Sequence, residues 1–271
     1  MFHAREFTFA GVSSSMYGLY CCDFGNKQHE DVSFGNRAKI IEERIQGRVQ
    51  PLHFGVNYHE EPLEFTLIFG GDEPIDRYDM QTIARWLTGH QQYQWLTIEE
   101  PDMTSLHFRC LIRELTPISV GWFQYAFSAD VICDCPYAYS NLFEQKFELT
   151  GEESTRSILR NFGTARECIR PTIVIDDSAG DGISQITLTN HTTGNVMQFD
   201  DMPTGKKIIT VDCNTGILTA TSPDTSGVID MYPYFNFEYI EMEDGDNDLE
   251  ITGDGKATIT FTGRYLHNVG A

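Results

Sequence analysis

Apolar and polar residues alternate with a period of two along most of the chain, a pattern typical of half-buried β-strands. In the first half we predict strands at residues 5–10, 17–22, 52–58, 63–69, 94–98, 106–115 and 122–133. Residues 52–58 and 63–69 flank a short turn at residues 59–62, so we expect them to form a hairpin. The chain therefore begins as a β-rich domain.

One segment has the period of a helix. Met80, Ile83, Ala84 and Leu87 follow the spacing i, i+3, i+4, i+7 that places apolar side chains on one face of a helix. Asp76 is a plausible N-cap before them, and a glycine at position 89 follows the last turn. We expect a single helix in the first domain, with Trp86 and Trp95 as packing anchors rather than as platforms for a ligand.

Short strands separated by Gly, Asp and Asn turns fill the second half, which is typical of an antiparallel sandwich. The predicted strands lie at residues 170–176, 183–190, 195–201, 206–212, 217–222, 235–242, 248–253 and 256–266. The fold class predicted is mainly β. The chain divides near residues 135–165, which gives an α+β domain with one α-helix at residues 1–140, a junction at residues 141–165, and an antiparallel β-sandwich at residues 166–271.

The chain is strongly acidic, with 40 Asp and Glu against 19 Lys and Arg and a net charge of −21. Both halves share the imbalance, and no basic stripe offsets it. Tight binding to nucleic acid or to an anionic membrane needs a cationic surface, so both are disfavoured. We see no signal peptide and no apolar run of membrane-spanning length, and expect a soluble, unexported protein.

Candidate chemistry is sparse. The chain has seven cysteines at irregular spacing, which favours reduced thiols over a disulfide framework. Cys133 and Cys135 are too close for the usual zinc spacing and have no second ligand pair, so a strand end is favoured over a metal site. The acidic run 243–248 fails as a calcium loop, because Leu249 and Gly255 stand where glycine and glutamate are needed. We predict no catalytic, cofactor-binding or metal residues.

The ordered features of the chain nevertheless resemble a known family. In the first half, three features carry the resemblance: the start "FTFAGVSSSMYG", the lone helix that ends in Arg85-Trp86-Leu87 before "WLTIEEPD", and the long strand that leads into "CPYAYS". In the second half, "RPTIVID", "TNHTTG" and "EDGDNDLEI" continue it. The chain resembles the distal tail proteins of long, non-contractile-tailed bacteriophages. On this reading "CDCPYAYS" (residues 133–140) marks a domain boundary.

The resemblance implies a structural, non-enzymatic protein of the virion, located at the tail tip and synthesised in the host cytoplasm. In such proteins the N-terminal domain is a β-sandwich-type domain with one α-helix, and it forms a hexameric ring. One face of the ring meets the tail-tube protein and the other the tail-associated protein, and DNA passes through the ring without specific binding. The second domain is galectin-like and projects outward, where it supports adsorption parts such as a receptor-binding protein. We expect residues 23–50, including "AKIIEERI", to contact a neighbouring subunit. Adding a strand to the sheet of that subunit is one way to make this contact.

Two other functions stay open. The second sandwich is a candidate carbohydrate-binding module for host attachment if Tyr232, Tyr234, Phe235 and Phe237 are exposed, although strand alternation favours a core role for half of them. A cell-wall glycan hydrolase would need two carboxylates facing across a cleft. With 40 acidic residues the sequence leaves that possibility open.

Overall fold

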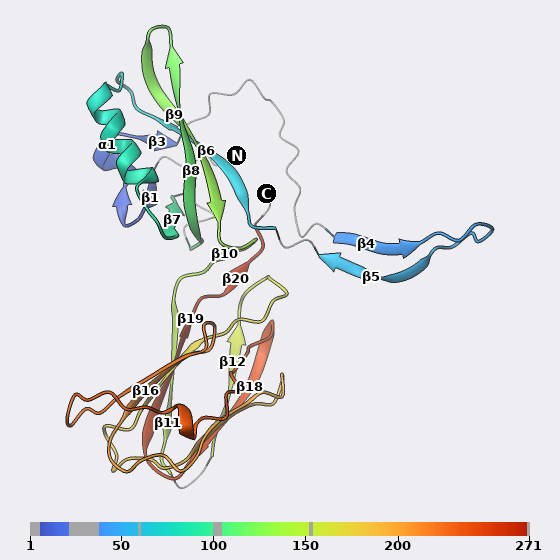
Figure 1. The fold of residues 1–271 in the computed structure, drawn as a ribbon, viewed down its shortest axis with the longest axis vertical. Coiled ribbons are helices and arrows are strands. Elements are labelled where there is room, and N and C mark those ends of the chain that lie inside the picture. The colour runs from blue at the N-terminus through green and yellow to red at the C-terminus, as the bar shows by residue number, and fades with distance from the viewer. Residues whose placement is uncertain (1–5, 22–37, 59–60, 100–104, 152–153, 270–271) are drawn as a thin grey trace. The chain divides into compact units, whose positions relative to one another are not determined.

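The chain folds into two units, each with its own hydrophobic core (Figure 1). The computed structural model describes residues 6–21, 38–58, 61–99, 105–151 and 154–269. The first unit spans residues 1–139 and 267–271, and the second spans residues 140–266. The chain thus passes from one unit to the other twice, with the short strand β20 (Leu266–His267) at the second passage.

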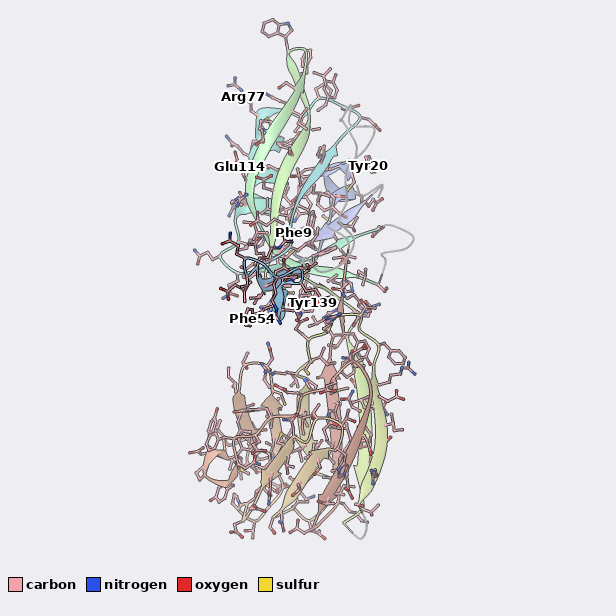
Figure 2. The ribbon with its side chains drawn as sticks, turned by 90° about the vertical axis from the view of Figure 1, so that its right-hand side faces the viewer. Phe9, Tyr20, Phe54, Arg77, Glu114 and Tyr139 are labelled. Carbon is pink, nitrogen blue, oxygen red and sulfur yellow. The ribbon has the colours of Figure 1, made fainter. Side chains whose placement is uncertain are left out.

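An antiparallel sheet forms the body of the first unit. Its strands run in the order β2-β1-β7-β8-β9-β6-β3, and β10 pairs with β8. The bounds are β1 (Phe7–Phe9), β2 (Val12–Ser13), β3 (Tyr20–Cys21), β6 (Glu64–Gly70), β7 (Gln94–Ile98), β8 (His107–Val120), β9 (Phe123–Cys133) and β10 (Ala138–Tyr139), with a 3₁₀ helix η1 (Ser14–Tyr17) after β2. Alternate residues face the core, as the period of two predicts: Phe7 and Phe9 on β1 are fully buried (Figure 2 labels Phe9).

Helix α1 (Arg77–Thr88) begins and ends where the sequence predicts. The Asp76 carboxylate accepts hydrogen bonds from the N–H groups of Tyr78 and Asp79, both at 2.8 Å. These bonds satisfy two donors that the first turn of a helix leaves without intrahelical partners. The Gly89 N–H closes the other end by donating to the Arg85 carbonyl.

Trp86 fixes α1 to the sheet. Its side chain is buried, its Nε1–H donates to the Phe9 carbonyl at 3.1 Å, and its ring stacks on Phe7 and Tyr17. The prediction of a packing anchor is confirmed for Trp86. Trp95 packs edge-on against Tyr139 but remains 38% exposed, so it covers the sheet only in part.

The predicted hairpin of residues 52–58 with 63–69 is wrong. Strand β5 (Leu52–Tyr58) pairs with β4 (Ala38–Glu43) in a separate two-stranded sheet. Strand β6 pairs instead with β9 and β3. Both strands alternate, but Leu67 and Phe69 on β6 are buried in the core, whereas Phe54 on β5 is 64% exposed.

Two antiparallel sheets form the second unit, as a sandwich requires. One has the order β11-β19-β13-β16-β17 and the other β12-β18-β14-β15. The bounds are β11 (Phe143–Leu149), β12 (Thr155–Asn161), β13 (Thr172–Asp176), β14 (Ile186–Asn190), β15 (Val196–Phe199), β16 (Ile208–Asp212), β17 (Ile217–Thr221), β18 (Gly245–Gly253) and β19 (Ala257–Gly263), with a 3₁₀ helix η2 (Tyr232–Tyr234).

Two segments of the second unit differ from the sequence expectation. Residues 141–165, treated as a junction, contain β11 and β12, and their side chains Phe147, Leu149 and Leu159 are buried in the core. Most outward-facing residues of both strands are polar, so the sequence pattern did not indicate strands in this segment. Residues 235–242 were expected to be a strand, but they form irregular backbone tied to neighbours by isolated bridges. Phe237 in this segment has φ of 60°, which no strand accommodates.

Candidate functional site

The β4–β5 hairpin exposes several apolar side chains of the first unit. Ile40 and Phe54 are 59% and 64% exposed, and Val49 at its turn is fully exposed. A two-stranded hairpin is marginally stable in water by itself, and among the described residues β4 and β5 pair with no third strand (Figure 1). The sequence analysis predicts that residues 23–50 contact a neighbouring subunit. Among the described residues, this prediction concerns β4 and the turn that follows it. Residues 22–37 lie outside the described residues.

The tip of the β8–β9 hairpin carries a second exposed cluster. Trp122 is 97% exposed, Phe123 59% and Val120 55%, around a glycine in the left-handed region at position 121. Near the tip, strands β8 and β9 pair only with each other, because the pairing of β7 with β8 ends at Cys110 of β8 and the pairing of β6 with β9 ends at Ala126 of β9. Trp is the side chain most enriched among energetically dominant interface residues. Sequence reasoning missed this cluster, since it placed Trp122 inside the sheet.

The residues 133–140 act as a structural boundary. Strand β9 ends at Cys133, and the division between the two units follows Tyr139. The Cys135 thiol donates to the Tyr137 carbonyl, and the Tyr139 hydroxyl donates to the Asp134 carboxylate at 3.1 Å. Burial raises the pKa of Cys135 to about 11, so this thiol is neutral at physiological pH.

In the other metal candidate, residues 243–248, several polar side chains are already bound by other groups of the protein. The Arg156 guanidinium binds both oxygens of Asp248 and lowers its carboxyl pKa. Asp246 lies 3.7 Å from Arg160, and the buried Asn247 side chain donates to backbone carbonyls of the same turn. Across the described residues, no cluster of three or more His, Cys, Asp or Glu is placed to hold a metal ion.

Both units match known domains by sequence. Residues 2–135 match the domain described as "Phage tail protein N-terminal domain", and residues 137–262 match "Phage tail C-terminal domain" of the same family. The chain belongs to this family of phage tail proteins. The junction between the matches, at residue 136, lies within four residues of the division between the folded units.

A solved structure shares the fold of this tail protein. The chain resembles the crystal structure of the Dit (gp 19.1) protein of phage SPP1, "a Paradigm of Hub Adsorption Apparatus in Gram-positive Infecting Phages". The TM-score is 0.65 at 15% identity, over 96% of this chain and 99% of that one. A chain of the phage p2 baseplate in its activated conformation with Sr matches with a TM-score of 0.49 at 11% identity, over 95% and 97% of the two chains. No curated protein sequence matches the chain.

The helices of this tail protein are short. Within the part of the chain that the structure describes, no helix has both the length and the apolar character needed to cross a membrane.

Proposed function

We propose that this tail protein is the distal tail protein of a long, non-contractile tail, a ring-shaped hub between the tail tube and the proteins that contact the host. The observation that carries the proposal is the fold match to the SPP1 hub protein, which extends over both units and nearly the full length of both chains. The exposed apolar elements of the first unit support an assembly role, because monomeric proteins rarely expose clusters of this kind.

The β4–β5 hairpin is the element we assign to ring closure. Its exposed residues Ile40, Ile41 and Phe54 would be covered by a neighbouring copy of the chain. The free backbone edges of a two-stranded sheet also offer hydrogen bonds to a strand of that neighbour. A closed ring repeats one head-to-tail contact between all its members, so a single arm on each copy is sufficient. Six copies are the number that the proposed family role implies.

Native mass measurement of the purified chain tests this arrangement. We expect the wild type to give a closed oligomer of 30.8-kDa chains, and the double variant Ile40→Asp/Phe54→Asp to give monomers. Carboxylates at these two positions would have to be buried unpaired in the contact, which is costly. The monomeric variant should keep its circular dichroism spectrum, because both side chains are exposed within the monomer.

The matched control is Ile158→Asp/Val228→Asp, which adds the same charge at exposed apolar positions of the second unit, 65% and 87% exposed. This control should assemble like the wild type. A hairpin variant that still forms the wild-type oligomer would contradict the role of the hairpin. A wild-type chain that stays monomeric at every concentration would contradict ring formation by this chain alone.

The partners we assign are the tail-tube protein on one face of the ring and the tail-associated protein on the other. A receptor-binding protein would attach through the second unit. The acidic surface supports passage of DNA, since a bore lined by carboxylates repels phosphate. Residues 1–150 contain 21 acidic and 11 basic residues.

A further inference from the structure

A polar pocket of about 630 Å³ opens in the second unit. It is formed by the β14–β15 turn at residues 193–195, the β16–β17 turn at residues 213–216, and the irregular segment at residues 238–241. The two turns belong to different sheets of the sandwich, so the pocket lies between the sheets where their strands turn. Its volume falls within the range of about 300–1,000 Å³ that is usual for small-molecule sites.

The pocket offers hydrogen-bonding groups that the protein leaves unused. Asn195 lines it, and the side-chain oxygen of this residue is buried without a hydrogen-bond partner among the described residues. The Arg170 guanidinium binds Glu241 Oε1 through Nε at 2.7 Å and Nη2 at 2.5 Å, and its Nη1 has no hydrogen bond to another described residue. Buried polar atoms are nearly always paired, so an orphaned oxygen indicates a missing donor. A hydroxyl group bound in the pocket would supply that donor.

One aromatic ring lines the pocket, and further rings connect to it through Phe235. The Tyr239 ring forms part of its wall, held by a hydrogen bond from its hydroxyl to the Gly216 carbonyl at 3.1 Å. Phe237, two residues before it, is 59% exposed and stacks on the Tyr232 ring with 6.1 Å between centroids. We call Tyr232, Phe237 and Tyr239 the aromatic ledge. Phe235 contacts both Tyr239 and Phe237, with ring centroids 5.4 Å and 5.5 Å apart, so the ledge extends from the pocket wall at Tyr239 to the exposed ring of Phe237.

Phe237 is held in a strained conformation. Its φ of 60° lies in the left-handed region, where a bulky residue is a genuine outlier. Strain of this kind costs free energy and persists at sites where the exposed side chain has a task. Burial does not explain the strain, because more than half of the Phe237 side chain is in solvent.

We propose that the pocket and the aromatic ledge bind an uncharged saccharide. A sugar ring presents hydroxyl groups at its edge and C–H groups on its faces. The hydroxyls fit Asn195 and Arg170, and the faces fit the rings of Tyr239 and Phe237. Glu238 and Glu241 outnumber the single cation Arg170 in the pocket, which disfavours a phosphate- or carboxylate-bearing glycan. This binding activity goes beyond the hub function and does not depend on it.

Ligand-observed saturation-transfer NMR on the full chain tests the proposal. The probes are glucose, galactose, N-acetylglucosamine and disaccharides of each. We expect at least one probe to give a saturable signal. Asn195→Ala should weaken that binding about tenfold, the effect of losing one well-placed hydrogen bond. Phe237→Gly should weaken it likewise while raising the melting temperature of the free protein, because glycine tolerates the left-handed conformation.

Tyr78→Ala, which removes a 78% exposed aromatic ring from α1, is the matched control and should bind like the wild type. The proposal is overturned if no probe gives a saturable signal. It is equally overturned if Asn195→Ala and Phe237→Gly both bind as tightly as the wild type, since the site would then lie elsewhere. Loss of a tail-protein contact in these variants, without any saccharide signal, would assign the ledge to protein docking instead. None of these outcomes alters the oligomer mass that tests the hub function.

Discussion

At the scale of single residues, the second unit contains an ion pair that is removed from water. The Lys207 side chain is 1% exposed and the Asp177 side chain 0%. Lys207 Nζ lies 3.3 Å from Asp177 Oδ2 and donates to the Ile183 carbonyl at 2.7 Å. The Asp177 carboxylate also accepts from the backbone N–H groups of Ile183 and Lys207. The pair therefore joins the start of β16 to the loop after β13.

Removing one member of this pair should strongly destabilise the protein. We expect Asp177→Ala to lower the free energy of unfolding by about 3–5 kcal/mol, because the Lys207 ammonium and two backbone N–H groups lose their acceptor inside the core. Urea unfolding followed by circular dichroism measures this change. Lys207→Met should cost less, since Asp177 keeps its two backbone donors. Equal or reversed costs would contradict the assignment of Asp177 as the centre of the network.

A buried thiol makes stability depend on alkaline pH. Burial raises the pKa of Cys213 from its ordinary value of about 9 to about 12. Below pH 9 the thiol is protonated in both the folded and the unfolded chain, so its contribution to stability is complete. Between pH 9 and pH 12 only the unfolded chain ionises, and the free energy of unfolding falls. Cys213→Ala should flatten this fall in urea midpoints measured across that range, whereas an unchanged slope would contradict the burial effect.

At the scale of elements, substitutions at exposed apolar positions should affect assembly without affecting the folding of the monomer. Trp122 at the β8–β9 tip is 97% exposed, so it contributes little to the stability of the monomer. We expect Trp122→Ala to leave the melting temperature unchanged and to weaken binding to an adjacent tail protein by about 2 kcal/mol or more, as for a central aromatic anchor of an interface. Co-purification with the tail-tube protein and the tail-associated protein provides the measurement. Undiminished binding to both would show that the tip faces solvent in the tail.

Strands β11 and β12 decide where the second unit can be cut from the chain. They pair with β19 and β18, respectively, and their apolar residues close the core. A fragment of residues 140–266 should therefore fold alone and unfold cooperatively. A fragment of residues 165–271 should fail to do so, because it lacks both strands. Circular dichroism and thermal melts of the two fragments distinguish them, and cooperative folding of the shorter one would contradict this division.

At the scale of the whole molecule, the charge of −21 governs encounters with nucleic acid. Binding to duplex DNA rests on Lys and Arg contacts that release counterions, and it is strongest at low salt. We expect the assembled protein not to retard duplex DNA in a gel at about 50 mM salt. A mobility shift at that salt would sink the assignment of a repelling bore, since it would reveal a cationic surface that the net charge conceals.

The local features of this protein were predictable from the sequence. The helix with its Asp76 cap, the strand of residues 94–98 and most strands of the second sandwich follow from side-chain periodicity and turn chemistry, which act between near neighbours. The family resemblance was also readable, because its motifs occur in a fixed order along the chain. The matching family domains confirm it.

Only the tertiary structure decided which strands pair and which residues stay exposed. Strands β5 and β6 share the same alternation, yet β6 lies within the large sheet and β5 in a two-stranded hairpin, because the pairing of β6 depends on partners far away in the sequence. The pocket lined by Asn195 and Tyr239 likewise joins turns from two sheets that no local pattern connects. Alternation specifies that a strand has two different faces, and only the packed molecule determines whether a core lies against one of them.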